Sequence, residues 1–275
     1  MRKDRVIIGL VLALALLSAC AHMTETRVNV SASPVIDRIL QRGELIVGTA
    51  GSMPPLNMTT KEGKIIGMEV DLARYMAKSM GVKLRLETMP FSKLLPALEA
   101  GKVDMILSGM TIIPERNLKM AFVGPYFISG KAFLTKIQTI ASVKDASDID
   151  NPNTTLAALK GSTSQFLVEE EIPRAKLVTT KNYDEAVDLV LQDKVDALVA
   201  DYPICLVSLA RHPNEGLISV FTRLTYEPIG IALPANDPLL VNWAENVLKM
   251  LKGSGELREL KEYWFGDTSW LKELK

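Results

Sequence analysis

Short apolar runs alternate with helical patterns through most of the chain, and this alternation indicates an α/β fold. Between the runs, apolar positions recur at the spacing of a helix face, as they do in residues 70–80 and 183–191. Strands that alternate with helices favour parallel sheets that helices cover on both faces. The expected strands are residues 45–49, 82–86, 103–107, 155–159, 176–178 and 195–199.

One short motif occurs twice. Gly-Lys-Val-Asp at 101–104 ends a helical pattern and leads into an apolar run, and Asp-Lys-Val-Asp at 193–196 does the same about ninety residues later. The order of strands and helices around the two copies is also similar, apart from a hairpin around Gly63 that lengthens the first copy. The repeat therefore predicts two similar α/β lobes.

Breakers and caps divide the first copy. Pro54-Pro55 breaks the loop after the first strand, and Gly81 ends the helix that follows the hairpin. Ser92 is expected to cap the next helix, with Pro96 close enough to the first turn to be tolerated.

Breaker-containing extended segments flank the second copy, and the C-terminal helical patterns at 239–251 and 257–264 are expected to return to the first lobe. A discontinuous first lobe follows from this arrangement. The predicted divisions are an export signal at 1–19, a tether at 20–33, lobe 1 at 34–125 and 229–275, lobe 2 at 130–224, and hinge strands at 126–129 and 225–228.

The N-terminus indicates export. Basic residues precede an uncharged apolar run at 6–17, which is shorter than the roughly 20 residues that span a bilayer. Leu-Ser-Ala-Cys at 17–20 resembles a bacterial lipobox, which implies that Cys20 is lipidated and anchors the mature chain to a membrane. An ordinary signal peptide with an incidental Cys20 is the alternative.

Charge and cysteine content exclude several classes of function. The chain has 32 basic and 32 acidic residues, so no net positive charge points to nucleic acid as a partner. If Cys20 is lipidated, Cys205 is the other cysteine and has no disulfide partner, which leaves it a buried small hydrophobe. Neither a disulfide framework nor a cysteine-rich metal site is available, and we expect no cofactor.

Polar residues follow several of the predicted strands. Ligands of parallel sheets bind beyond the carboxyl ends of the strands, so the segments 50–56, 108–116 and 161–164 are expected to share one crevice with Asp201. Arg116 offers a planar fork of donors for a carboxylate, and Asp201 would pair with an ammonium group.

Further donors for a carboxylate are expected from Thr111, from the backbone near Gly109, and from a helix start at 161–163. Taken singly, each residue also has an ordinary interpretation. Arg116 could be a solvated surface residue, and Asp201 could be a turn or cap residue. Their joint placement at strand ends supports the binding interpretation.

Several motifs resemble one family. Gly-Met-Glu-Val-Asp-Leu-Ala at 67–73 is similar to the signature of the family 3 bacterial extracellular solute-binding proteins, the polar amino-acid receptors of ABC importers. The segments 108–116, 160–163 and 196–201 resemble that family's carboxylate-binding loop, its second-lobe counterpart and the segment that supplies the amino-group ligand. The similarity extends over about residues 35–268.

The resemblance implies a two-lobe periplasmic-binding-protein-like fold of type II, with a ligand cleft between lobes joined by two hinge strands. It also implies a clamp for an α-amino acid, with Asp201 on the ammonium group. The residues expected around the carboxylate are Arg116, Thr111, Gly109, Ser108, Thr163 and Ser162.

Selectivity for the ligand side chain is expected from the apolar residues of the first lobe. Met53 and Leu56 stand where members of the family often have aromatic residues, and Phe91 is expected to form a pocket wall. Ala50 replaces an acidic residue found in receptors for cationic amino acids, which favours a neutral ligand. The alternative for Met53, Leu56 and Phe91 is ordinary core packing.

These features predict a non-enzymatic, monomeric receptor that closes on an amino acid and presents it to a membrane ABC permease. Two alternatives remain. Some proteins similar to the family are dehydratases of small cyclic acids, which need an additional acid in the cleft. A sensory module would signal through a membrane partner.

Overall fold

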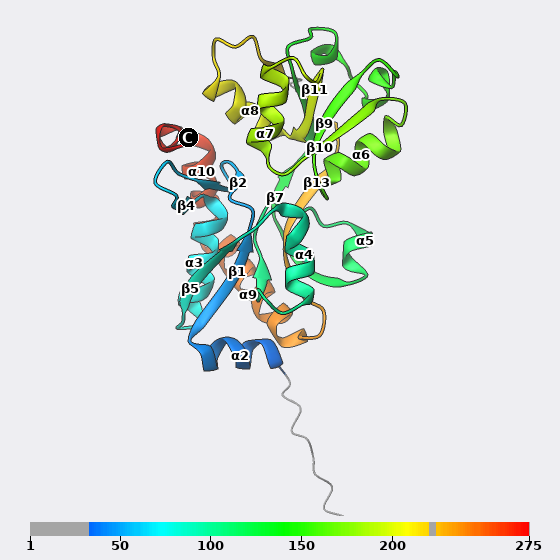
Figure 1. Cartoon of the computed structure of the whole chain (residues 1–275). Helices are drawn as coiled ribbons and strands as arrows, with labels where there is room; N and C mark the ends of the chain where they lie inside the picture. Colours follow the sequence, from blue (N-terminus) through cyan, green and yellow to red (C-terminus); the bar gives the residue numbers. More distant parts are fainter. Residues whose placement is uncertain (1–32, 220–223, 275) are drawn as a thin grey trace, which may run out of the picture. The chain divides into compact units, whose positions relative to one another are not determined.

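The computed structural model describes residues 33–219 and 224–274. Two five-stranded sheets form the framework of this part of the chain (Figure 1). The first sheet has the spatial order β5 (Lys83–Thr88), β1 (Glu44–Thr49), β6 (Met105–Ile106), β13 (Glu227–Pro234) and β7 (Met120–Ser129). The second has the order β10 (Lys176–Thr180), β9 (Thr155–Leu159), β11 (Ala197–Asp201), β8 (Lys131–Thr135) and β12 (Ile218–Ser219). We call the two sheets with their helices lobe 1 and lobe 2.

The sheets are mixed. In lobe 1, β1 pairs in parallel with β5 and β6, and in lobe 2 β9 pairs in parallel with β10 and β11, as the strand and helix pattern predicts. The remaining pairs are antiparallel because the chain crosses between lobes along β7 and β8, which only Gly130 separates, and returns along β13. Figure 1 shows β7 and β13 side by side, and their register places Glu227 opposite Ser129.

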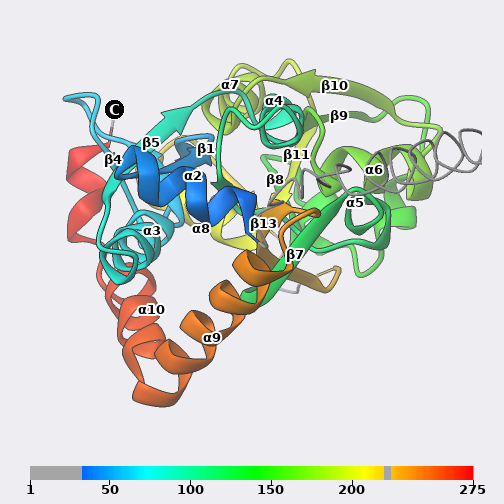
Figure 2. The same cartoon turned by 90° about the horizontal axis from the view of Figure 1, so that it is seen from below.

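Helices cover the sheet of lobe 1 on both faces. Ile46 belongs to the same apolar cluster as Leu94 of one helix, whereas Val47 belongs to a second cluster with Leu72 of another, because successive strand residues point to opposite faces. The helices of this lobe are α2 (Pro34–Arg42), α3 (Met68–Ser79), α4 (Phe91–Glu99), α5 (Pro114–Asn117), α9 (Pro238–Ser254) and α10 (Glu256–Gly266). Figure 2 shows α9 and α10 packed next to one another, and α10 also contacts α3, so the C-terminal helices return to lobe 1.

Lobe 2 has three longer helices. They are α6 (Thr163–Glu171), α7 (Tyr183–Leu191) and α8 (Tyr202–Arg211). The helical pattern at 183–191 is confirmed to the residue, and the side chain of Asn182 caps this helix by accepting a hydrogen bond from the Glu185 amide at 2.8 Å.

The shorter elements of the described chain are the 3₁₀ helices η2 (Ile140–Ser142), η3 (Ala146–Ile149) and η4 (Ser269–Glu273), and the small sheet of β2 (Ser52–Met53), β3 (Asn57–Thr59) and β4 (Ile65–Ile66).

The repeated motif has the same structural role in both lobes. The Asp104 carboxylate accepts a hydrogen bond from the Ile46 amide at 2.9 Å, and the Asp196 carboxylate accepts one from the Thr155 amide at 2.7 Å. Each aspartate therefore joins the strand that follows the motif to that strand's parallel neighbour, which is β1 in lobe 1 and β9 in lobe 2. Gly101 has φ +66° and the equivalent Asp193 has φ +54°, so both copies turn through the left-handed region.

Three local predictions were wrong. The helix α4 begins at Phe91 after Pro90, so Ser92 lies inside its first turn and does not cap it, and Pro96 lies within the helix. The strand expected at 103–107 is reduced to Met105–Ile106. An apolar run indicates that its residues are buried, but it does not indicate which of them pair with a neighbouring strand. The strand expected at 195–199 is Ala197–Asp201, because the Asp196 side chain binds Thr155 just before the strand begins.

The predicted signal at 1–19, Cys20 and the tether as far as Ala32 lie outside the described residues. Within the ranges that are described, no helix combines the length and the apolar character needed to cross a bilayer. Cys205 is fully buried, as expected, and burial raises the pKa of its thiol to about 12.

Candidate functional site

The loops that follow β6 and β9 come together with the end of β11 where the two lobes meet. The Thr111 hydroxyl of lobe 1 lies 3.3 Å from the Thr163 hydroxyl of lobe 2. Arg116 donates from Nη1 to the Thr111 carbonyl at 2.9 Å and from Nη2 to the Gly161 carbonyl at 3.0 Å. The structure therefore brings Arg116, Thr111 and Thr163 together, although they are far apart in the sequence.

Arg116 is buried and lies between two aromatic rings. It is 7% exposed, and its Cζ lies 5.8 Å from the centroid of the Phe91 ring and 6.0 Å from that of Phe166. Burial lowers the pKa of Arg116 to about 10, while the negative charges of Glu227 and Asp201 oppose this shift. The guanidinium is consequently still protonated at neutral pH, and the interpretation of Arg116 as a solvated surface residue is wrong.

Glu227 lies at the start of β13 and links the hydroxyl groups of both lobes. Its Oε2 accepts hydrogen bonds from Thr111 and Thr163, each at 2.8 Å, and its Oε1 accepts one from Thr225 at 2.8 Å. Burial raises the pKa of Glu227, but the charge of Lys131 and these hydrogen bonds outweigh burial and hold the pKa below its ordinary value. Glu227 is thus an anion that holds the two threonines in place.

Lys131 connects the two buried carboxylates. Its Nζ lies 2.8 Å from Oδ2 of Asp201 and 3.5 Å from Oε2 of Glu227, and the side chain is 1% exposed. Asp201 occupies the position before α8, but its side chain makes no capping hydrogen bond. The carboxylate of Asp201 is therefore held by a lysine and not used as a helix cap.

Sequence reasoning did not identify Lys131 and Glu227 as site residues. Both lie in strands along which the chain crosses between the lobes, β8 and β13, and Lys131 directly precedes the apolar run 132–134. A charged residue at the edge of a buried run needs a partner. That rule is the signal that could have identified them, but it would not have named the partners.

Oδ1 of Asp201, on the lobe 2 side, is buried, and it forms no hydrogen bond with another described residue in this structure. Ser164 and Tyr183 are also buried, and their hydroxyl groups interact with each other. Burial raises the pKa of Tyr183 well above its usual range, and the Asp201 charge adds to the effect. A buried polar atom without a partner is costly, so Oδ1 of Asp201 marks where a polar ligand group would be stabilised.

Apolar residues of lobe 1 lie beside the charged cluster. Met53 and Leu56 are buried, and a side chain at Gly109 would meet Met53 Cε at 2.4 Å and Leu56 Cδ1 at 3.4 Å. Gly109 also has φ +60°, so the backbone conformation favours glycine there, and a larger residue would also force the end of the Met53 side chain to move. Phe91 is buried against Arg116. The role of these three side chains in selectivity stays a prediction.

Two predicted serines have local structural partners. The Ser108 hydroxyl accepts a hydrogen bond from the Ala50 amide at 2.9 Å, which ties the loops after β6 and β1 together. Ser162 caps α6 by accepting from the Gln165 amide at 3.3 Å, and its hydroxyl donates to the Leu159 carbonyl at 2.7 Å. Their direct contact with a ligand stays a prediction.

The buried carboxylate of Glu69 holds two loops of the candidate site together. Oε1 of Glu69 accepts hydrogen bonds from the Gly109 amide at 2.6 Å and from the Tyr126 hydroxyl, and Oε2 accepts one from Asn57 Nδ2 at 2.6 Å. The other end of the Asn57 amide accepts a hydrogen bond from the Gly51 amide at 2.8 Å. Burial raises the pKa of Glu69, and its hydrogen bonds oppose the shift. Glu69 thus connects the loop at 50–56 to the loop at 108–116.

Replacing Glu69 with alanine is expected to lower the free energy of unfolding by about 1–3 kcal/mol, because buried donors on Gly109, Tyr126 and Asn57 would lose their acceptor. Urea denaturation measures the change. Glu62→Ala, at an exposed position of the neighbouring hairpin, is the matched control and should have little effect. Equal stability of the two variants would contradict the assigned role of Glu69.

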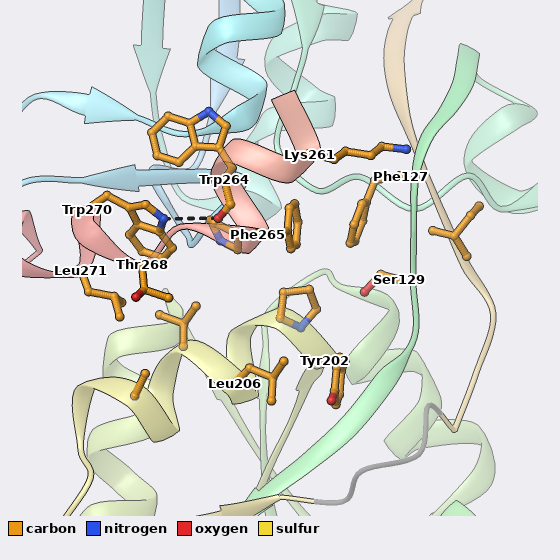
Figure 3. Close-up of a pocket in the computed structure, with 15 residues that line it drawn as sticks. Phe127, Ser129, Tyr202, Leu206, Lys261, Trp264, Phe265, Thr268, Trp270 and Leu271 are labelled. Atoms are coloured by element: carbon orange, nitrogen blue, oxygen red, sulfur yellow. Dashed lines mark hydrogen bonds between the residues drawn. The ribbon is translucent and has the colours of Figure 1, made fainter. Parts of the chain in front are cut away.

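Two cavities lie near the junction of the lobes. One, of about 550 Å³, adjoins the charged cluster and is lined by Thr163, Phe166 and Glu227 among others. The other, of about 400 Å³, lies between α8 and the C-terminal helices (Figure 3). There Tyr202 and Leu206 of α8 lie across the cavity from Trp264 and Phe265 of α10.

The lining of the second cavity is mostly apolar, and Phe127 stacks on Phe265 with ring centroids 4.6 Å apart. None of the predicted ligand-binding side chains lines it. It offers no pair of opposite charges for a zwitterion, so we place the candidate site at the charged cluster. In the described residues, no group of three His, Cys, Asp or Glu side chains is arranged to hold a metal ion.

The chain is similar to a known family and to solved structures. Residues 45–267 match the model of the bacterial extracellular solute-binding proteins, family 3. A binding component assigned to an ABC transporter of Wolinella succinogenes, solved in complex with lysine, is 41% identical, with a TM-score of 0.78 over 84% of this chain and 99% of that chain. An ancestral arginine-binding protein solved with glutamine is 33% identical, with a TM-score of 0.76 over 82% of this chain and 99% of that one.

One similar protein is an enzyme. The cyclohexadienyl dehydratase of Pseudomonas aeruginosa is 26% identical over 229 residues, which cover 83% of this chain and 85% of the dehydratase. Proteins that share this fold can be receptors or enzymes, so the residues of the cleft must distinguish the two functions.

Proposed function

Because the chain belongs to the family 3 bacterial extracellular solute-binding proteins, we propose that it is the receptor of an ABC importer and binds a neutral α-amino acid between its lobes. Relatives in this family act outside the cytoplasm. Lipidation of Cys20 would hold the mature chain at a membrane, next to the permease that receives the amino acid.

The observation that carries the proposal is the presence of a buried cation from one lobe and a buried anion from the other where the lobes meet. Arg116 of lobe 1 has the donor fork that fits an α-carboxylate, and Thr111 and Thr163 lie beside it. Asp201 of lobe 2 keeps Oδ1 without a hydrogen-bond partner among the described residues, which suits an α-ammonium group. A zwitterion can satisfy both ends at once.

Closure of the lobes is the proposed mechanism. Arg116 reaches the Gly161 carbonyl, and Glu227 holds a threonine from each lobe, so the residues of the clamp are also residues of the contact between lobes. An amino acid that bridges Arg116 and Asp201 would add favourable contacts only when the lobes are together, and it would shift the population toward that state. The permease would recognise the closed form.

A thermal-shift screen tests the proposal. The domain from Ser33 onward would be unfolded and refolded to remove carried-over ligand, and then heated with each proteinogenic amino acid. We expect a concentration-dependent rise in Tm with one or a few neutral amino acids, because a ligand that binds only the native state stabilises it. No rise with any amino acid would contradict the proposed function.

The similarity to a dehydratase gives a second candidate. Dehydration needs a proton donor beside the substrate, and such an acid has a raised pKa. Glu69 has a raised pKa, but three donors already occupy its oxygens below the cleft, whereas the pKa of Glu227 is lowered. These contacts favour a receptor. Turnover of prephenate or arogenate by the purified protein would instead support the enzyme.

A further inference from the structure

We propose that Lys131 is a determinant of specificity that excludes cationic amino acids from the cleft, an inference that rests on the proposed amino-acid receptor function. Lys131 lies in β8, directly after the crossing between lobes, and its side chain is 1% exposed. The predicted clamp, with Arg116 for the carboxylate and Asp201 for the ammonium group, does not require a lysine at this position. The contacts of Lys131 show how it would act.

The first argument is the position of the ammonium group. Nζ lies 2.8 Å from Oδ2 of Asp201 and 3.5 Å from Oε2 of Glu227, so a single cation is shared by two buried carboxylates. Oδ1 of Asp201 has no hydrogen-bond partner among the described residues. A ligand ammonium group can therefore bind Oδ1 while Lys131 keeps Oδ2, and the two cations then share one aspartate.

The second argument is the balance of charge. The buried ionic groups of the cluster are Arg116, Lys131, Asp201 and Glu227, two positive and two negative, and a zwitterionic ligand leaves their sum at zero. A ligand with a cationic side chain would add one positive charge to a site with little solvent to screen it. Glu115 follows Pro114 at the start of α5, but it is exposed and therefore a weak counter-ion.

The third argument is the lack of an acid on the lobe 1 wall. The residues expected around the ligand side chain are Ala50, Met53, Leu56 and Phe91, none of which is charged. Glu69 lies below these loops, but its oxygens already accept hydrogen bonds from Gly109, Tyr126 and Asn57. On this wall a cationic side chain would therefore find no free carboxylate to offset the charge of Lys131. The acids that line the adjoining cavity, Glu115, Asp145, Glu170 and Glu171, are exposed and therefore weak counter-ions.

Removing the charge of Lys131 should reverse the preference. In Lys131→Gln the cluster would carry one net negative charge, which a cationic ligand neutralises and a neutral ligand does not. The sharpest probes are two pairs that have similar size and differ by one charge, citrulline with arginine and glutamine with lysine. Isothermal titration calorimetry would measure the ratio of their affinities in the wild type and in the variant.

We expect the wild type to bind the neutral member of a pair more tightly, and Lys131→Gln to shift the ratio toward the cationic member by about tenfold or more. Lys131→Arg keeps the charge and should keep the neutral preference. Lys136→Gln is the matched control, because Lys136 lies five residues further along and pairs with the exposed Asp193 at 3.0 Å. Lys131→Met replaces Lys131→Gln if the glutamine variant does not fold.

The possible failures are distinguishable. If the wild type binds a neutral amino acid and a folded Lys131 variant keeps the same ratio, Lys131 is a structural counter-ion and the specificity proposal is overturned. A variant that binds both members of a pair more weakly by the same factor also keeps the same ratio of affinities. If neither the wild type nor the variants bind any member of the pairs or of the proteinogenic panel, the receptor function itself is overturned.

Discussion

Replacing Arg116 with alanine is expected to weaken amino-acid binding by at least about 100-fold, roughly 3 kcal/mol, because a buried ligand carboxylate would lose its charged partner. Arg116 is 7% exposed, so water cannot easily replace its guanidinium group. It also joins the lobes through its hydrogen bonds to the carbonyls of Thr111 and Gly161. Both losses act in the same direction, and calorimetric titration of the best ligand measures their sum.

The control for this experiment removes an arginine from the surface. Arg258 lies in α10, is 75% exposed at its side chain and pairs with Glu262 at 3.7 Å, so Arg258→Ala should leave binding unchanged. A second comparison uses the carboxamide of the ligand, which lacks the negative charge. If Arg116 binds the carboxylate, the variant should discriminate poorly between the acid and its amide. Wild-type affinity in a folded Arg116→Ala protein would rule out the clamp.

Replacing Asp201 with asparagine is expected to weaken binding by about 30- to 100-fold, roughly 2–3 kcal/mol, because the ligand ammonium group loses its counter-ion while the shape of the side chain is preserved. Lys131 would keep Glu227 as a partner at 3.5 Å, which limits damage to the fold. The measurement is again calorimetric titration, with the thermal unfolding of the variant recorded in parallel.

An analogue of the ligand without the amino group makes the Asp201 experiment specific. The wild type should bind this analogue weakly, and Asp201→Asn should bind it no worse than the wild type does, since the lost contact involves the ammonium group alone. Asp193→Asn is the matched control, because Asp193 is 76% exposed at its side chain and lies outside the cleft. An equal loss of affinity for the ligand and its deamino analogue would show that Asp201 acts by a different route.

Repetition and periodicity were reliable guides to the fold. The two copies of the Lys-Val-Asp motif make matching contacts, since Asp104 binds the amide of Ile46 and Asp196 binds the amide of Thr155. The helical pattern at 183–191 is a helix with the same bounds. The helix depends on residues that are close together in the chain, and the Lys-Val-Asp motif occurs twice, so both features can be recognised in the sequence.

Pairing and orientation were less predictable. The run at 103–107 is buried, but only Met105 and Ile106 form a strand, paired with Val47 and Gly48 of β1. The antiparallel pairing of β7 with β13 depends on where the chain crosses between lobes. Neither outcome is contained in the apolar pattern, since burial and strand pairing select for the same side chains.

By itself the sequence determined the alternating α/β elements, the doubled lobe and the two charges, Arg116 and Asp201, that follow strand ends. Only the tertiary structure decided which groups meet those charges. It placed Lys131 against Asp201 and Glu227, and it brought Glu227 between Thr111 and Thr163. The reason is physical: elements form through contacts between near neighbours, whereas a buried charge is stabilised by whichever partners the folded chain brings within a few ångströms.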